Sequence, residues 1–176
     1  MATTSVMPMA ALWYARHGIP IFPCKPRGKE PLTPRGFHDA TTDEAKVRQW
    51  LSQWPDANIG IPTGRPSSFL VVDVDPRNGG PTDRAELIRV LGPIPETAEV
   101  ITGGGGRHIY FRYAGGPVPK QLAPGIDLKG DGGYIIAPPS IHPSGRRYKV
   151  DGIVGPKAFL STPMAPSWLR ERIATI

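Results

Sequence analysis

Residues 69–75 read Phe-Leu-Val-Val-Asp-Val-Asp, a continuous apolar run that ends in two carboxylates. Such a run, bounded by turn residues, predicts a buried strand. Because side chains alternate across a strand, Asp73 and Asp75 are expected on the same side of it. Two neighbouring acids repel each other unless a cation lies between them, and Mg²⁺ or Mn²⁺ would accept these oxygens and leave room for phosphate oxygens. The alternative is a plain strand that runs into the Asp-Pro turn of residues 75–80.

Length and composition favour one soluble globular domain. The chain has 176 residues, enough to bury a core, and 39% of them are hydrophobic. It contains no apolar run of membrane-spanning length, and residues 1–9 lack a signal-peptide pattern, so we expect a cytoplasmic protein with no membrane partner. A single cysteine, Cys24, excludes an internal disulfide and a cysteine-rich zinc site.

The charge balance is basic. A formal net charge of +6 and a pI of about 9.7 favour a polyanionic partner, although a solvated basic surface would give the same numbers. The basic residues cluster early and late in the chain: Lys25, Arg27, Lys29 and Arg35, then Arg146, Arg147, Lys149 and Lys157.

Short periodic segments separated by proline and glycine predict an α+β fold. Helices are expected over residues 9–17, 43–54 (with Thr42 as the N-cap), 83–91 and 168–173. Strands are expected over residues 19–23, 58–62, 69–74, 98–102, 107–113, 126–128 and 134–137, with 147–150 closing a sheet edge.

Four consecutive glycines, residues 103–106, precede Arg107 and His108. Without Cβ atoms, this loop lets a phosphate or sugar approach the backbone closely. It leads into a strand rather than a helix, so it is neither a P-loop nor a dinucleotide-binding fingerprint. Arg107 and His108 are candidates for neutralising and hydrogen-bonding phosphate, while a flexible hairpin with a satisfied histidine is the alternative.

Two later motifs carry further polar candidates. Asp127 lies between apolar residues, as an inward-facing acid would, and Lys129 shares its predicted face. Asp131, between glycines, is typical of a turn. The basic loop of residues 138–147 could contact a triphosphate or a template backbone through Ser140, His142 and Arg146. The alternative is an ordinary proline-glycine turn.

Taken together, the ordered motifs resemble the prim-pol domain of the archaeo-eukaryotic primase superfamily, the N-terminal module of bifunctional DNA primase/polymerases. That family's pattern is a strand ending in two spaced acids, then a small-x-His motif, then a hydrophobic-Asp motif. The matching residues are Val71-Val72-Asp73-Val74-Asp75, Gly106-Arg107-His108 and Ile126-Asp127, with flanking similarity from about Ala10 to Tyr148.

The resemblance implies a fold with an RRM-like mixed or antiparallel catalytic sheet, flanking helices and a small N-terminal α/β subdomain. It implies one catalytic domain over residues 1–176, either excised from a longer primase-helicase or standing alone. A helicase domain or protein is therefore an expected partner.

The resemblance also implies template-directed nucleotidyl transfer, in which NTPs or dNTPs are added to a primer or an initiating nucleotide on single-stranded DNA. By this similarity, Asp73, Asp75 and Asp127 hold two Mg²⁺ or Mn²⁺ ions and, with His108, form the catalytic set. His108 would bind the phosphates of the nucleotide. Weaker candidates for nucleotide or template contacts are Gly106, Arg107, Lys29, Lys129, Ser140, His142 and Arg146.

Two other functions fit the same sequence. A non-catalytic module that binds single-stranded DNA or regulates priming would keep the basic surface but incorporate no nucleotide. A metal-dependent nuclease would use similar acids and degrade a strand without NTPs. Three clustered acids argue against the first function, and the glycine loop with His108 suits triphosphate capture better than hydrolysis.

Overall fold

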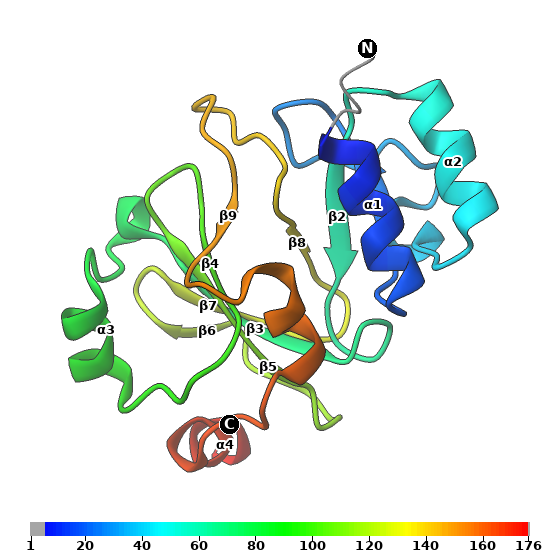
Figure 1. Cartoon of the computed structure of the whole chain (residues 1–176). Coiled ribbons are helices and arrows are strands. Elements are labelled where there is room, and N and C mark those ends of the chain that lie inside the picture. Colours follow the sequence, from blue (N-terminus) through cyan, green and yellow to red (C-terminus); the bar gives the residue numbers. More distant parts are fainter. Residues whose placement is uncertain (1–5, 176) are drawn as a thin grey trace.

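The computed structural model describes residues 6–175 and arranges them around two antiparallel sheets (Figure 1). The smaller sheet has the strand order β1-β2-β8 and the larger sheet the order β6-β7-β3-β5-β4-β9. In Figure 1, α1 and α2 lie beside β2 at one end of the molecule, and α3 and α4 lie beside the larger sheet. The segment that leads from β8 to β9 runs between these two parts.

The predicted elements are found with small shifts at their ends. The α-helices are α1 (Val6–Arg16), α2 (Glu44–Gln53), α3 (Arg84–Leu91) and α4 (Ser167–Ala174). The strands are β1 (Phe22–Cys24), β2 (Asn58–Pro62), β3 (Phe69–Val74), β4 (Glu99–Ile101), β5 (Arg107–Arg112), β6 (Gln121–Ala123), β7 (Ile126–Lys129), β8 (Tyr134–Ile136) and β9 (Lys149–Val150). Short 3-10 turns cover Gly36–Asp39, Pro76–Asn78 and Gly155–Ser161.

Two details differ from expectation. The N-cap of α2 is Asp43 rather than Thr42, because the Asp43 side chain accepts a hydrogen bond from the Ala45 amide. Strand β6 was not predicted from the sequence; its residues lack the alternation of apolar and polar side chains that marks a half-buried strand.

The two faces of the larger sheet bury different sets of side chains. On one face, Leu70, Val72 and Val74 of β3 pack with Leu87 of α3 and Leu169 of α4. The other face of the same strand carries Phe69, Val71 and Asp73. Phe69 and Val71 pack toward the N-terminal part of the chain. Asp73 follows them on the same face, so their packing fixes its position.

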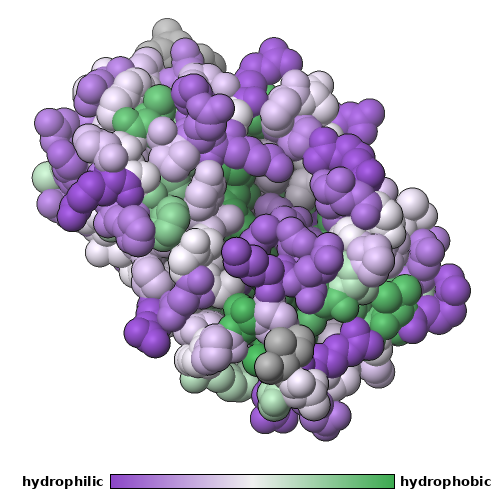
Figure 2. Space-filling model, turned by 180° about the vertical axis from the view of Figure 1, so that it is seen from behind, coloured by the Kyte–Doolittle hydropathy of each residue, from purple (hydrophilic) through white to green (hydrophobic). Residues whose placement is uncertain are grey.

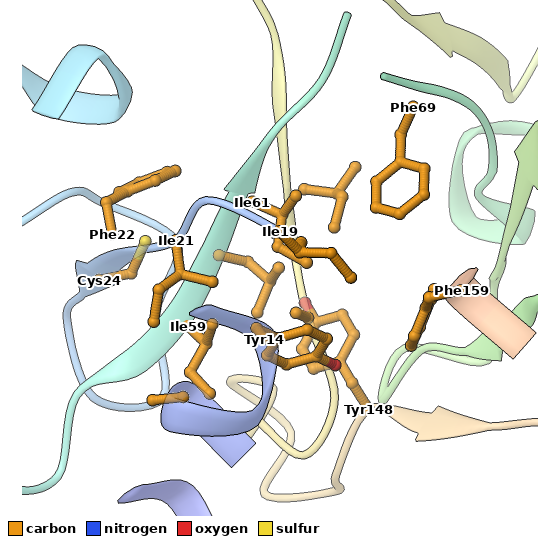
Figure 3. Close-up of a cluster of buried hydrophobic side chains, with 14 of the residues drawn as sticks. Tyr14, Ile19, Ile21, Phe22, Cys24, Ile59, Ile61, Phe69, Tyr148 and Phe159 are labelled. Carbon is orange, nitrogen blue, oxygen red and sulfur yellow. The ribbon is translucent and has the colours of Figure 1, made fainter. Parts of the chain in front are cut away.

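A mixed cluster of aliphatic and aromatic side chains joins the two sheets (Figure 3). Tyr14 of α1 and Phe22 of β1 lie in it together with Phe69 of β3. Phe159 lies 5.9 Å from the ring of Tyr14 and 6.2 Å from that of Phe69, measured between centroids. Because one cluster includes residues from both sheets, the orientation of the N-terminal part relative to β3 is set by packing.

The α+β class and the antiparallel sheet are confirmed. The predicted single domain also includes residues 1–5 and 176, which lie outside the described residues. Between residues 6 and 175, no helix has both the length and the apolar character needed to cross a bilayer. Hydrophilic residues cover much of the face in Figure 2, and the hydrophobic residues form separate patches among them.

Candidate functional site

Three polar residues form one row across the centre of the larger sheet. Asp73 on β3 is in register with His108 on β5 and with Asp127 on β7. Residues directly opposite each other in antiparallel strands project their side chains to the same face, with Cβ atoms roughly 5 Å apart. The structure therefore brings together Asp73, Asp127 and His108, which the sequence placed in three separate motifs.

Asp73 lies between a histidine and a lysine. Its Oδ1 lies 3.5 Å from Nε2 of His108, and its Oδ2 lies 3.9 Å from Nζ of Lys129. Lys129 also binds Oδ2 of Asp127 at 3.1 Å. Burial raises the pKa of Asp73, but the His108 hydrogen bond and the nearby positive charges outweigh it, so the pKa of Asp73 lies below its ordinary value. The Asp73 and Asp127 side chains keep 28% and 43% of their surface accessible, which leaves both open to a ligand.

Asp75 continues the strand by one residue and caps the turn that follows. Its amide donates to the Gly125 carbonyl at 2.8 Å, and its side chain accepts from the amide of Arg77 at 3.0 Å. The Arg77 guanidinium adds two hydrogen bonds of 3.1 and 3.2 Å, and the Asn78 side chain adds one of 3.0 Å. Hydrogen bonding by Arg77 outweighs burial and lowers the pKa of Asp75.

The three carboxylates have the donor chemistry that divalent metals need, but they are not arranged as a metal cluster. Asp73, Asp75 and Asp127 supply the oxygen donors that Mg²⁺ and Mn²⁺ prefer. Within residues 6–175, however, no three acid, histidine or cysteine side chains are already gathered as a metal cluster. Arg77 binds Asp75 and Lys129 binds Asp127, so protein cations neutralise these two carboxylates.

His108 is buried and only partly satisfied. Its side chain is 7% exposed, and no described residue hydrogen-bonds its Nδ1. The ring of Tyr148 lies 6.0 Å away and that of Tyr110 6.5 Å away, between centroids. The imidazole therefore presents one nitrogen to Asp73 and keeps the other without a partner, an arrangement that favours a functional group over a packing residue.

The N-terminal part contributes Lys29. This residue lies in the loop after β1, and its positive charge is close enough to help lower the pKa of Asp73. The Tyr134 hydroxyl fixes the loop by donating to the Lys29 carbonyl at 3.0 Å. The loop after β1 thus brings a positive charge near Asp73.

Asn58 is a positioning residue that the sequence did not reveal. It is 1% exposed, and its Nδ2 donates to the carbonyls of Gly28 at 3.0 Å and Ile141 at 2.7 Å. Its Oδ1 accepts from the Ile141 amide at 2.9 Å. One side chain therefore joins the Lys29 loop to the loop that carries His142.

The His142 loop packs against the four glycines. The Ser144 hydroxyl donates to the Gly103 carbonyl at 2.8 Å. A Cβ added to Gly103 would lie 2.2 Å from the Cβ of His142, so only glycine permits this contact. The glycine loop is packed beside the acids, not free as a flexible hairpin.

His142 faces this glycine loop. Its Nδ1 lies 2.9 Å from the Ser144 hydroxyl oxygen and 3.0 Å from the Ser144 amide nitrogen, so the Ser144 turn fixes the ring. Burial, with the charges of Lys29 and Arg77 adding to it, lowers the pKa of His142 below its usual value. The sequence had named His142 as a candidate for contacting a triphosphate or a template backbone.

Three candidates from the sequence do not join this face. Arg107 projects to the opposite face, where it binds Glu99 at 2.7 Å and Asp151 at 2.6 Å. Gly106 serves chain packing, since a Cβ there would lie 2.3 Å from the Val74 carbonyl oxygen. Ser140 is fully buried and accepts from the Ile59 amide at 2.8 Å. Arg107 and Ser140 thus have structural partners where nucleotide contacts were expected.

The remaining candidates divide clearly. Arg146 is exposed at the rim of the loop, where a polyanion can reach it. Asp131 is the turn residue that its glycine neighbours indicated, since it accepts from the Arg65 amide at 2.7 Å. Cys24 is fully buried, and burial raises the pKa of its thiol to about 12, which excludes a ready nucleophile.

Tyr148 and Arg77 are further residues at the site that the sequence did not single out. The Tyr148 ring lies 6.0 Å from His108 and 5.8 Å from His142, so it packs against both imidazoles. Arg77 looked like part of an ordinary turn. Its role depends on the turn after β3 folding back toward the glycine loop, which the sequence does not indicate.

Comparison with known families agrees with this geometry. The family described as bifunctional DNA primase/polymerase, N-terminal, matches residues 11–168. The matched range contains every site residue described above. A search of curated proteins found no significant match.

Proposed function

The chain belongs to the bifunctional DNA primase/polymerase N-terminal family, and we propose that it is a template-directed nucleotidyl transferase. The observation that carries the proposal is the row of Asp127, Asp73 and His108 on one face of the larger sheet, with the two carboxylates accessible. Two carboxylates with a histidine beside them suit the transfer of a nucleotide from a triphosphate with release of pyrophosphate.

In this proposal Asp73, Asp75 and Asp127 would hold two divalent ions, Mg²⁺ or Mn²⁺. When bound, such ions lower the pKa of an attacking hydroxyl and neutralise the leaving pyrophosphate. Asp73 has the most restricted position, since β5 and β7 flank it on both sides. It would therefore fix the geometry of the site, while Asp75 and Asp127 adjust to the substrate.

The basic groups around the acids would bind the nucleotide and the nucleic acid. The charges of Lys29 and Lys129 both act on Asp73, and these lysines would neutralise phosphate oxygens. His108 would donate to a phosphate once its side chain turns from Asp73. Arg146, exposed at the rim, is our candidate for contacting the backbone of a single-stranded DNA template or primer.

One observation favours the second candidate, a non-catalytic module that binds single-stranded DNA. Protein cations already neutralise the carboxylates, which would suit a surface that binds DNA without metals. A catalytic site nevertheless accounts better for the row, because carboxylates facing phosphates weaken plain DNA binding.

The deciding experiment supplies a single-stranded template, Mg²⁺ or Mn²⁺ and labelled NTPs or dNTPs, with and without a primer. Growth of the primer supports the polymerase, and products without a primer add primase activity. Salt-sensitive DNA binding without any incorporation would refute catalysis and support the binding module. Degradation of the labelled strand without nucleotides would identify a nuclease instead.

A further inference from the structure

Arg77 lies between Asp75 and the glycine loop. Its guanidinium makes a bidentate contact with Asp75, with Nε 3.1 Å from Oδ1 and Nη2 3.2 Å from Oδ2. Parallel hydrogen bonds of this kind are the strong form of an Arg-carboxylate pair. As long as they persist, both oxygens of Asp75 are engaged and a divalent ion must displace them.

The same guanidinium also borders the glycine loop. A Cβ built on Gly104 would lie 3.3 Å from Cζ of Arg77 and 3.2 Å from Nε2 of His142. The guanidinium, the imidazole and a backbone without side chains therefore converge on one small region. Guanidinium, an imidazole N–H and accessible backbone are groups that bind phosphate.

Arg77 has the freedom to exchange one partner for the other. Its side chain is 58% exposed, whereas that of Asp75 is 26% exposed. Asp75 is held further by the amide of Arg77 and the side chain of Asn78, so the carboxylate keeps its place if the guanidinium leaves. A rotation of the arginine side chain alone would release the acid.

We propose that Arg77 is a displaceable cation that neutralises Asp75 in the empty site and transfers to the triphosphate of the incoming nucleotide when Asp75 binds a divalent ion. This inference rests on the proposed function. The proposal couples metal binding to triphosphate binding. When the metal displaces Arg77 from Asp75, the positive charge of the guanidinium becomes free to bind the triphosphate.

Two affinities test the proposal without measuring turnover. The first is the affinity for Mn²⁺ alone, followed by the electron paramagnetic resonance of free Mn²⁺. The second is the affinity for a non-hydrolysable deoxynucleoside triphosphate at saturating Mn²⁺. Both are measured for wild type, Arg77→Ala, Arg77→Lys and the control Arg16→Ala, which removes another Arg-carboxylate pair at Glu44 on α2.

The expected changes have opposite signs. Arg77→Ala should bind Mn²⁺ roughly three- to tenfold more tightly, because the exposed pair that competes with the metal is lost. It should bind the triphosphate about tenfold more weakly, because a charged donor is lost. Arg77→Lys should fall between wild type and Arg77→Ala in both assays, and Arg16→Ala should match wild type. Circular dichroism confirms that each variant is folded.

Other results would overturn the inference in distinguishable ways. Unchanged Mn²⁺ affinity in Arg77→Ala would show that the arginine does not compete for Asp75. Unchanged triphosphate affinity would show that no transfer occurs. In both cases a wild-type protein that extends primers leaves the proposed function intact. If wild type binds no Mn²⁺, the metal role and this inference fail together.

Discussion

Asp73 and Asp127 lie directly opposite each other on neighbouring antiparallel strands, β3 and β7, and Lys129 contacts both carboxylates. This register depends on packing, since Val72 and Leu128 form the next pair and point into the apolar cluster on the far face. A slip of one residue would turn one carboxylate into that cluster, so burial of the apolar partners holds the two acids together.

The first prediction concerns this pair. Asp73→Asn and Asp127→Asn should each reduce primer extension by about a thousandfold or more, because each removes a carboxylate that would hold the divalent ions of the proposed reaction. Labelled primer extension measures the loss, and thermal melting followed by circular dichroism checks the fold. Asp56→Asn, at an exposed position away from the sheet, is the control. Extension at the wild-type rate by either site variant would exclude that acid from catalysis.

The pH dependence of stability follows from the low pKa of Asp73. Its folded pKa lies below the ordinary value of 3.8, so the unfolded chain takes up this proton first as the pH falls. The stabilisation by ionised Asp73 is therefore complete above about pH 4 and is lost as the pH falls through the folded pKa. Wild type should exceed Asp73→Asn in free energy of unfolding at pH 6.

That difference should narrow below about pH 4. Urea unfolding of both proteins from neutral to acid pH measures it, provided that both transitions remain two-state. Asp75 and Asp151 also have lowered pKa values, so both proteins should lose stability in acid, and only the difference between them reports on Asp73. A difference that is independent of pH would mean that Asp73 gains nothing from its cationic neighbours.

The sequence predicted the strands well and the roles of their flanking loops less well. Apolar runs bounded by turn residues gave β2 and β3 their bounds, because strand periodicity is a local property. Strand alternation puts His108 and Tyr110 of β5 on one face, with ring centroids 6.5 Å apart, and Ile109 and Phe111 on the other face. The register that aligns Asp73 with Asp127 is a long-range property, and only the family resemblance indicated it.

Two of the predicted site residues have partners inside the protein that the sequence did not indicate. Ser140 looked like a phosphate ligand, but its hydroxyl satisfies the Ile59 amide inside the protein. Arg107 adjoins His108 in sequence and, by strand alternation, faces away from it. Asn58 and Arg77 were missed because an asparagine in a strand and an arginine in a turn carry no sign of distant contacts.

Asn58 should be important for both stability and nucleotide affinity. Asn58→Ala would leave the amide of Ile141 and two carbonyl groups without their partner, at a cost of about 2–3 kcal/mol in the free energy of unfolding. Because Asn58 joins the loops that carry Lys29 and His142, KM for the nucleotide should rise roughly fivefold.

Urea unfolding and steady-state primer extension below the unfolding transition test these two effects. Gln53→Ala, at an exposed position at the end of α2, is the matched control and should change neither quantity. Loss of stability with an unchanged KM would show that Asn58 supports the fold without positioning the two loops.

Single Gly→Ala substitutions in the glycine loop should affect protein stability and triphosphate affinity differently. Gly104→Ala places its Cβ 3.2 Å from His142 Nε2 and 3.3 Å from Arg77 Cζ, both at the ends of side chains that can shift. Stability should change by less than about 0.5 kcal/mol, while triphosphate affinity should fall because the converging donors are pushed apart. Gly105→Ala meets no atom within 4 Å but has a φ of +84°, so it should cost about 1 kcal/mol of stability and leave affinity unchanged.

Gly106→Ala should have the largest effect on stability of the three variants. Its Cβ would lie 2.3 Å from the Val74 carbonyl oxygen, and backbone cannot move aside as a side chain does. We expect a loss of about 2 kcal/mol or more, with melting temperature as the measure. Equilibrium binding of a non-hydrolysable triphosphate to all three variants completes the comparison. If Gly105→Ala weakens binding as much as Gly104→Ala, the phosphate contacts the tip of the loop, and the region between Arg77 and His142 is not its site.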